Sequence, residues 1–252
     1  MPHLPRHRLW VANLSPGRLV LSGDSAHYLR VVLRLSAGDQ VALMSGNGQV
    51  ATANLMLLQR DSAELEVGEI TPAPKVRLEL TVAVPTPKGE RADWLVEKLT
   101  ELGVARIVWM ITARSVVVAK QGTQRAERWS RIAQAAAKQS GSARTPTIEG
   151  PLALDAILGY QAATRYIGAR GGVPLVHELA LAPPAATSLL LIGPEGGFAD
   201  DELERAQQSG VVAVGLGVYT LRMETAALAG ASMLLCDLGD ANMAASRERE
   251  AS

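Results

Sequence analysis

Two short segments hold the residues best suited to chemistry. They are LIGPEGGF at 191–198 and GLGVYTLRMETAAL at 215–228, and each follows an apolar run typical of a strand. A strand that runs into glycine and proline predicts a sharp turn with little side chain, which lets a flat ligand approach the backbone amides. Open α/β sheets bind ligands at such strand ends. For the first segment alone, a tight connection into a helix capped by Asp201, with Glu204 completing a capping box, explains the pattern equally well.

Two charged residues distinguish the second segment. Arg222 and Glu224 stand directly before an apolar stretch, predicted as a helix over 224–238, that has no further charge before Asp237. Charges in such surroundings need a partner or a ligand. An ion pair between the two at the start of the helix is the structural alternative, but we favour a functional role. The GLGVYT run resembles a dinucleotide fingerprint, but Thr220 replaces its third glycine, which disfavours such a site.

Other kinds of catalytic site lack their motifs. The sequence has no HExxH, paired-carboxylate or GxSxG motif, so we expect neither a metal ion nor Ser/His/Asp catalysis. The histidines are scattered along the chain, which is typical of surface or core positions: His3, His7, His27 and His177.

The cellular compartment follows from the cysteine and the apolar runs. Cys236 is the only cysteine, so no intrachain disulfide can form, which fits a reducing compartment. The amino-terminal MPHLPRHRLW is not followed by an apolar run of signal-peptide length, and no stretch approaches the roughly 20 apolar residues that span a bilayer. We therefore expect a cytoplasmic protein with no membrane partner.

The amino-terminal part predicts a small β-barrel. Residues 8–70 contain short apolar runs separated by turn residues. One helix is predicted over 24–35, with Asp24 capping its first turn. One face of this helix is predicted to be apolar, because Tyr28, Val31, Val32 and Leu35 recur at helical spacing. Arg30 and Arg34 share the other face.

A different pattern begins after Pro72 and Pro74, which block both helix and ladder pairing. Apolar strands then alternate with helices, which predicts an α/β domain with a mostly parallel sheet. The last helix is apolar nearly all round, so core or a second subunit must cover it, and we expect a homodimer. The predicted strands lie within 77–85, 105–112, 188–193 and 211–217, and the helices contain 91–102, 127–139 and 201–208. The predicted domains are 1–72, 73–240 and a disordered tail at 241–252.

Basic residues gather in the middle of the chain, although the formal net charge is +0. Between Arg106 and Arg144 the only acid is Glu127. This run is a candidate phosphate-contacting surface, and an ordinary solvated helix face is the alternative. The basic residues are Arg106, Arg114, Lys120, Arg125, Arg128, Arg131, Lys138 and Arg144.

Several segments together resemble one known family. The two glycine-containing segments, PKGERADWLVEKLTELGV at 87–104, ARSVV and AERWSRIAQAAAKQS resemble the RsmE family of 16S rRNA (uracil-N3)-methyltransferases in the SPOUT superfamily. HYLRVVLRLSAGDQV resembles that family's PUA-like RNA-binding barrel, so the resemblance spans nearly the whole chain. It implies a trefoil-knotted SPOUT domain, S-adenosyl-L-methionine as cofactor, a homodimer, and uridine 1498 of 16S rRNA in the small ribosomal subunit as the target.

The resemblance implies which residues hold the cofactor, and with it we form our own hypotheses for catalysis and RNA contact. Uracil N3 must lose a proton, and Arg222 would stabilise the developing anion. Glu224 would orient Arg222 or act as the base, with Glu195 as a second candidate. The cofactor would be held by Gly193, Pro194, Glu195, Gly196, Gly197, Leu216, Gly217, Leu221, Arg222 and Thr225. RNA would be contacted by Arg8, Arg30, Arg34, Arg114 and Arg144, whereas Ser142 stands where the family commonly has an arginine.

Two rival functions remain open at the level of sequence. One is a SPOUT methyltransferase that modifies a different RNA site, because a fold does not fix a substrate. The other is a non-catalytic RNA-binding protein of ribosome assembly, which the intact Arg222-to-Thr225 segment disfavours.

Overall fold

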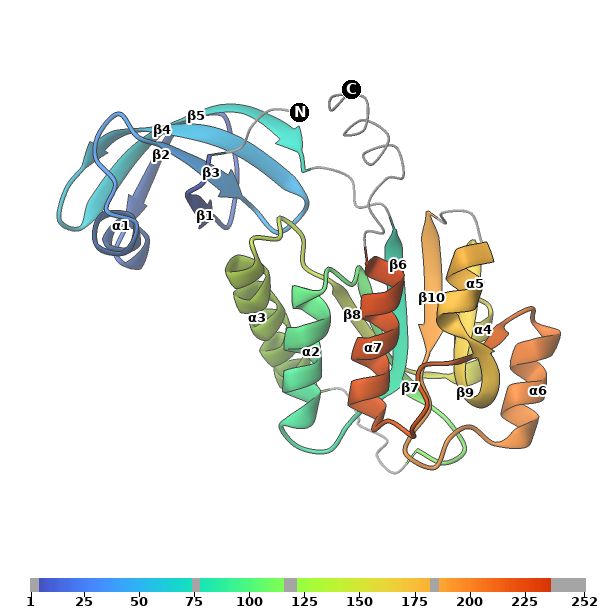
Figure 1. Cartoon of the computed structure of the whole chain (residues 1–252). Helices are drawn as coiled ribbons and strands as arrows, with labels where there is room; N and C mark the ends of the chain where they lie inside the picture. Colours follow the sequence, from blue (N-terminus) through green and yellow to red (C-terminus); the bar gives the residue numbers. More distant parts are fainter. Residues whose placement is uncertain (1–4, 74–77, 116–121, 182–185, 237–252) are drawn as a thin grey trace, which may run out of the picture. The chain divides into compact units, whose positions relative to one another are not determined.

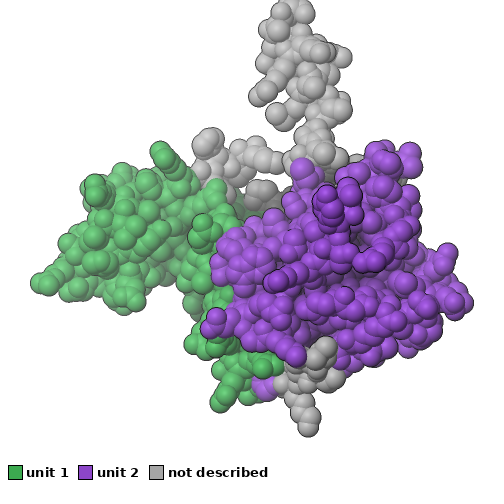
Figure 2. Space-filling view, turned by 60° about the horizontal axis from the view of Figure 1, so that its bottom comes forward, with its two compact units in different colours: residues 1–76, 123–147 green, residues 77–122, 148–252 purple. Residues whose placement is uncertain are grey.

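The computed structural model describes residues 5–73, 78–115, 122–181 and 186–236. Two compact units divide the chain: residues 1–76 with 123–147, and residues 77–122 with 148–252 (Figure 2). The predicted tail and Lys120 lie outside the described residues. Among the helices of the described ranges, none is both long and apolar enough to cross a membrane.

The first unit contains a five-stranded sheet in the order β1-β3-β4-β5-β2 (Figure 1). β1 runs parallel to β3, and the other pairs are antiparallel. Alternate residues of these strands build one core, in which Val41, Leu43, Leu55 and Leu65 are at most 1% exposed. The predicted amino-terminal β unit is therefore confirmed. Its strands are β1 (Arg8–Trp10), β2 (Gly17–Ser22), β3 (Gln40–Met44), β4 (Gln49–Leu58) and β5 (Ser62–Pro72).

The helix predicted over 24–35 is present but buries a different face. It consists of α1 (Asp24–His27) and a π-helical turn η1 (Tyr28–Val32), in which the Leu33 N–H donates to the carbonyl five residues earlier. Ala26 and Leu29, which lie three residues apart on one side of the helix, are its buried residues. The prediction of a buried apolar face was wrong for Tyr28, Val31 and Val32, which are exposed, and right for Leu35, which is buried. The predicted cap was also wrong, because Gly23 and not Asp24 holds the N-cap position.

The helix α3 (Thr123–Ser140) belongs to the first unit although it comes late in the sequence. The residues after it complete hydrogen bonds of the β unit. Trp10 Nε1 donates to the Ser142 carbonyl at 3.2 Å, and the Gly48 N–H donates to the Ala143 carbonyl at 2.9 Å. The sequence predicted this helix, but it did not predict that the helix and the residues after it belong with the β unit.

The second unit contains a six-stranded sheet in the order β11-β9-β10-β6-β7-β8 (Figure 1). The pairs β6 with β7, β6 with β10, β9 with β10 and β9 with β11 are parallel, so the predicted mostly parallel sheet is confirmed. β8 and β9 were not predicted. Its strands are β6 (Glu79–Pro85), β7 (Arg106–Ile111), β8 (Thr147–Ala153), β9 (Thr164–Pro174), β10 (Thr187–Leu191) and β11 (Val212–Gly215).

Helices cover both faces of this sheet. Leu189 and Leu191 of β10 pack in a core with α4 and α6, whereas a Cβ on Gly230 of α7 would lie 2.7 Å from the side chain of Leu190. Successive residues of a strand point to opposite faces, so α7 lies opposite α4 and α6. The helices are α2 (Arg91–Glu101), α4 (Leu154–Leu158), α5 (Leu175–Leu181), α6 (Asp200–Gln208) and α7 (Met223–Leu235).

Candidate functional site

A pocket of about 1090 Å³ lies in the second unit, where β9, β10 and β11 end. Three segments contribute most of its lining: the second half of β9 with the start of α5 (within 168–176), the connection after β10 (192–198), and the end of β11 with the connection after it (214–221). Helices α6 and α7 add Leu203, Met223, Ala226 and Met233. The carboxyl ends of parallel strands meet at one edge of a sheet, which explains why segments far apart in sequence converge here. The two segments that the sequence marked for chemistry both reach this pocket.

Most of the residues predicted to hold the cofactor line the pocket. Arg222 and Thr225 do not line it, and both are exposed at the start of α7. The lining residues are Gly193, Pro194, Glu195, Gly196, Gly197, Leu216, Gly217 and Leu221. The structure therefore brings these eight together, and their role toward a cofactor stays a prediction.

The glycine loop at 193–197 presents backbone to the pocket for a steric reason. A Cβ on Gly193 would lie 2.9 Å from the Phe198 ring, closer than real Cβ contacts allow. Gly197 has φ +71°, a conformation that side chains disfavour, and its N–H closes a turn onto the Pro194 carbonyl at 2.8 Å. A larger residue at either position would displace the loop.

Arg91 pairs with Glu224 in the structure, and sequence reasoning missed this contact. Arg91 Nη1 lies 3.0 Å from Glu224 Oε1 and 3.7 Å from Glu195 Oε1. Glu224 is 5% exposed, and its Oε1 meets no donor at hydrogen-bonding angles, so the contact is an ion pair without an aligned hydrogen bond. The first turn of α7 also favours its negative charge. The only available signal for Arg91 was its place within the PKGERADW segment.

Replacing Arg91 by methionine should lower the free energy of unfolding by about 1–3 kcal/mol, because the buried Glu224 carboxylate loses its charged partner. The matched control is Arg106→Met, because Arg106 pairs at 3.2 Å with Glu149, whose side chain is 39% exposed. That pair should contribute at most about 1 kcal/mol. Urea unfolding of both variants measures the difference, and equal losses would contradict the importance of Glu224 burial.

A second missed residue, Arg170, lies at the pocket. Arg170 lines it and donates from Nη2 to Thr220 Oγ1 at 2.7 Å. This hydrogen bond joins β9 to the connection after β11. β9 itself was not predicted, so no expectation placed a cation here.

Arg114, predicted to contact RNA, holds the glycine loop. Its Nη1 donates to the Gly196 carbonyl at 2.8 Å and to the Phe198 carbonyl at 3.2 Å, and the residue is exposed. Its contact with RNA stays a prediction, and the two carbonyl contacts give it a structural role as well.

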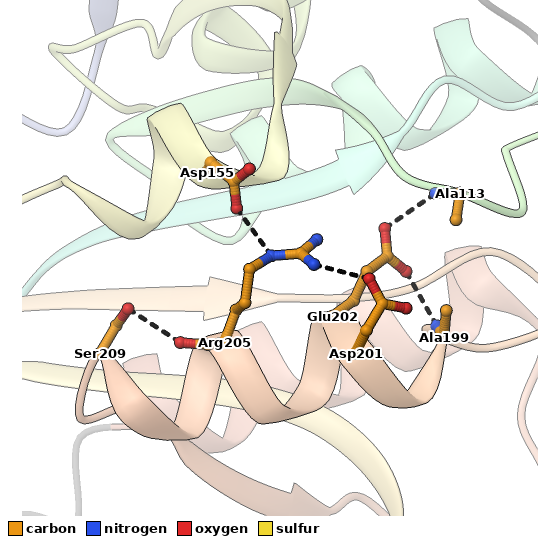
Figure 3. Close-up of polar contacts among 7 residues, drawn as sticks. All are labelled: Ala113, Asp155, Ala199, Asp201, Glu202, Arg205 and Ser209. Atoms are coloured by element: carbon orange, nitrogen blue, oxygen red, sulfur yellow. Dashed lines mark hydrogen bonds and ion pairs between the residues drawn. The ribbon is translucent and has the colours of Figure 1, made fainter.

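The start of α6 differs from the prediction. Glu202 makes the cap contact by accepting from the Ala199 N–H at 2.8 Å, so Asp201 and Glu204 were the wrong choices (Figure 3). The cap is therefore Ala199, two residues before the predicted Asp201. Asp201 instead accepts from Arg205 at 2.6 Å, and this guanidinium lowers the pKa of Asp201.

The remaining RNA candidates lie in the first unit. Arg8, Arg30 and Arg34 are exposed, whereas Arg144 is half-buried and packs over Gly48. Helix α3 adds further exposed cations, here called the α3 basic face: Arg125, Arg128, Arg131 and Lys138. In the described part of the chain no His, Cys, Asp or Glu cluster could hold a metal ion.

Comparisons with known proteins agree with this architecture. Residues 73–235 match an RNA methyltransferase domain and residues 21–68 an RNA methyltransferase PUA domain. Ribosomal RNA small subunit methyltransferase E of Bacillus subtilis is 30% identical over 223 residues, covering 82% of this chain and 86% of the relative. The Mycobacterium bovis protein of the same name is 32% identical over 217 residues, covering 82% of each.

A solved structure shows the same fold over most of the chain. Ribosomal RNA small subunit methyltransferase E from Neisseria gonorrhoeae, bound to S-adenosyl methionine, has a TM-score of 0.72 and 30% identity, covering 91% of this chain and 96% of that one. Both the barrel-like first unit and the parallel sheet thus have counterparts in one group of proteins. The chain belongs to the RNA methyltransferase family that includes ribosomal RNA small subunit methyltransferase E, with the PUA domain and the methyltransferase domain of that family.

Proposed function

We propose that this enzyme transfers the methyl group of S-adenosyl-L-methionine to N3 of a uridine in 16S rRNA, with uridine 1498 as the position. The pocket at the ends of β9, β10 and β11 is the observation that carries the proposal. Its glycine loops offer backbone amides and carbonyls to a ligand, and the related Neisseria gonorrhoeae protein binds this cofactor. Bound S-adenosylmethionine supplies an electrophilic methyl group on its sulfonium sulfur.

The side chains of this site fit a methyl transfer to a nitrogen that first carries a proton. Glu195 lines the pocket with its side chain 56% exposed, so its carboxylate can reach a substrate proton even though one oxygen lies 3.7 Å from Arg91 Nη1. Glu224 is buried against Arg91 and outside the pocket lining, which suits a positioning role better than proton transfer. We therefore assign the base to Glu195. We keep the stabilisation of the uracil anion with Arg222, which lies outside the pocket lining but has an exposed cationic side chain that a substrate can meet.

The first unit would hold the RNA around the target. N3 lies on the pairing edge of uracil, so the uridine must be unpaired or flipped out to reach the pocket. Arg8, Arg30, Arg34 and Arg144 and the α3 basic face would contact the surrounding phosphates, together with Arg114 of the second unit.

The remaining features of the proposal have two sources. The family resemblance implies a trefoil knot around the cofactor loops and a homodimer, whereas the prolines at 72 and 74 and the single cysteine favour domains at 1–72 and 73–240 and a cytoplasmic location. Two exposed residues support the proposed homodimer. Val218 and Tyr219 line the pocket and are at least 85% exposed, so a second subunit could cover their large hydrophobic side chains. Thr225 and Ser232 leave one side of α7 open to such a partner.

The proposal is tested by incubating the purified protein with radiolabelled S-adenosylmethionine and small ribosomal subunits from cells that lack the modification. Label recovered in 16S rRNA is the expected result. Label in another RNA would indicate a methyltransferase with a different target. Binding of rRNA without cofactor binding or transfer would indicate the non-catalytic assembly protein.

A further inference from the structure

The buried carboxylate of Glu202 joins the residue that follows the glycine-loop connection to the turn after β7. Glu202 is 3% exposed, and its two oxygens accept from two backbone N–H groups, Ala113 at 2.8 Å and Ala199 at 2.8 Å (Figure 3). Ala113 follows β7, and Ala199 follows the connection that lines the pocket. One side chain therefore ties the pocket loop to a turn far away in sequence.

The turn that receives this contact is held by its own hydrogen bonds. The Ser115 N–H donates to the Thr112 carbonyl at 3.0 Å, and the Thr112 N–H donates to Ser115 Oγ at 2.9 Å. Arg114 of the same turn donates to the Gly196 and Phe198 carbonyls. The carboxyl-terminal end of the glycine loop is thus fastened to the turn at 112–115 twice, by Arg114 at Gly196 and Phe198 and by Glu202 at Ala199.

Helix capping alone does not explain this arrangement. A cap needs only the contact with the Ala199 N–H, whereas the second oxygen of Glu202 reaches a residue 89 positions away. Glu202 does not line the pocket, so it affects a ligand only through the loop. A loop held in its bound shape before binding loses less conformational freedom, and the ligand binds more tightly.

We propose that Glu202 is a positioning residue for the cofactor loop, with Arg114 as a second fastening, and that both raise the affinity for S-adenosylmethionine without touching it. The inference rests on the proposed function, because it takes this cofactor as the ligand of the pocket. It adds that two residues outside the pocket lining, Glu202 and Arg114, increase the affinity of the pocket for the cofactor.

The variant Glu202→Gln tests the inference. Its amide keeps one oxygen acceptor but turns an NH₂ group toward the other N–H donor, so one of the two contacts is lost. The dissociation constant for S-adenosylmethionine should rise about tenfold or more, as expected for a lost charge-assisted hydrogen bond. The KM for the cofactor should rise equally, while kcat at saturating cofactor should change by less than about twofold, because uniform binding is what has been lost.

The matched control is Glu204→Gln, which makes the same change at an exposed position of the same helix and should leave the dissociation constant unchanged. Titration calorimetry with S-adenosylmethionine and no RNA compares wild type, control and variant. Cofactor binding by folded Glu202→Gln with wild-type affinity would overturn the inference while leaving the proposed function intact. Absence of cofactor binding by the wild type would overturn both.

A second variant decides the matter if Glu202→Gln does not fold. Arg114→Met removes the other fastening from an exposed side chain, and folding should tolerate it. Its dissociation constant for the cofactor should rise about threefold to tenfold. An unchanged constant for folded Arg114→Met would overturn the inference, and measurement without RNA keeps any RNA contact of Arg114 out of the result.

Discussion

Replacing Arg222 by alanine is expected to lower kcat by about 10²- to 10³-fold, the loss typical of removing one group that stabilises a developing anion. The fold should survive. Arg222 caps α7 through its backbone, with φ −64° and ψ 153°, and makes no side-chain cap hydrogen bond. Its side chain is exposed, so the free energy of unfolding should change by no more than about 0.5 kcal/mol. Single-turnover methylation at saturating cofactor and subunit measures the chemical step directly.

The variant Arg222→Lys is the control for this experiment. Lysine keeps the charge but loses the planar pair of donors, so its rate should fall between those of wild type and alanine. A kcat for Arg222→Ala equal to that of the wild type would remove Arg222 from the mechanism. Loss of the fold would instead assign it a structural role.

The affinity for rRNA is expected to fall about a thousandfold when salt rises from about 50 to about 200 mM, if about six phosphates are contacted. The exposed arginines of the first unit and the α3 basic face supply enough cations for that number. Filter binding with an rRNA fragment at several salt concentrations gives the slope, which counts the released counterions.

Single substitutions refine this prediction. Removing one phosphate-contacting cation, as in Arg131→Ala, should reduce the salt slope by about one. Arg18→Ala is the control, because Arg18 already pairs with Glu64 at 2.6 Å. Its replacement should leave the salt slope unchanged. Binding that is insensitive to salt would contradict the assignment of the basic surface.

The sequence revealed the pocket because its two segments depart from ordinary α/β composition. A strand followed by Gly193-Pro194 and a charged pair before an apolar helix have few structural explanations, and both segments reach the pocket. β9 escaped prediction, although it lies inside the sheet, because Arg165, Arg170 and its glycines interrupt the apolar run by which buried strands are found.

The contacts around the pocket depend on tertiary structure that no local pattern encodes. The partner of Glu224 is Arg91, far away in sequence, and not the adjacent Arg222. Glu202 was overlooked because a capping pattern two residues later explained the same segment. The apolar face of η1 is exposed, although the spacing of Tyr28, Val31 and Val32 predicted that it would be buried, and nothing in that spacing indicated the π-helical turn.

The identity of the methylated nucleoside tests the central claim most directly. Small subunits that lack the modification are incubated with the enzyme and S-adenosylmethionine, and their 16S rRNA is digested to nucleosides and analysed by mass spectrometry. The account predicts 3-methyluridine, formed by the wild type and strongly reduced with Arg222→Ala. A different methylated nucleoside, or none despite bound cofactor, would contradict the assignment of uracil N3 as the acceptor.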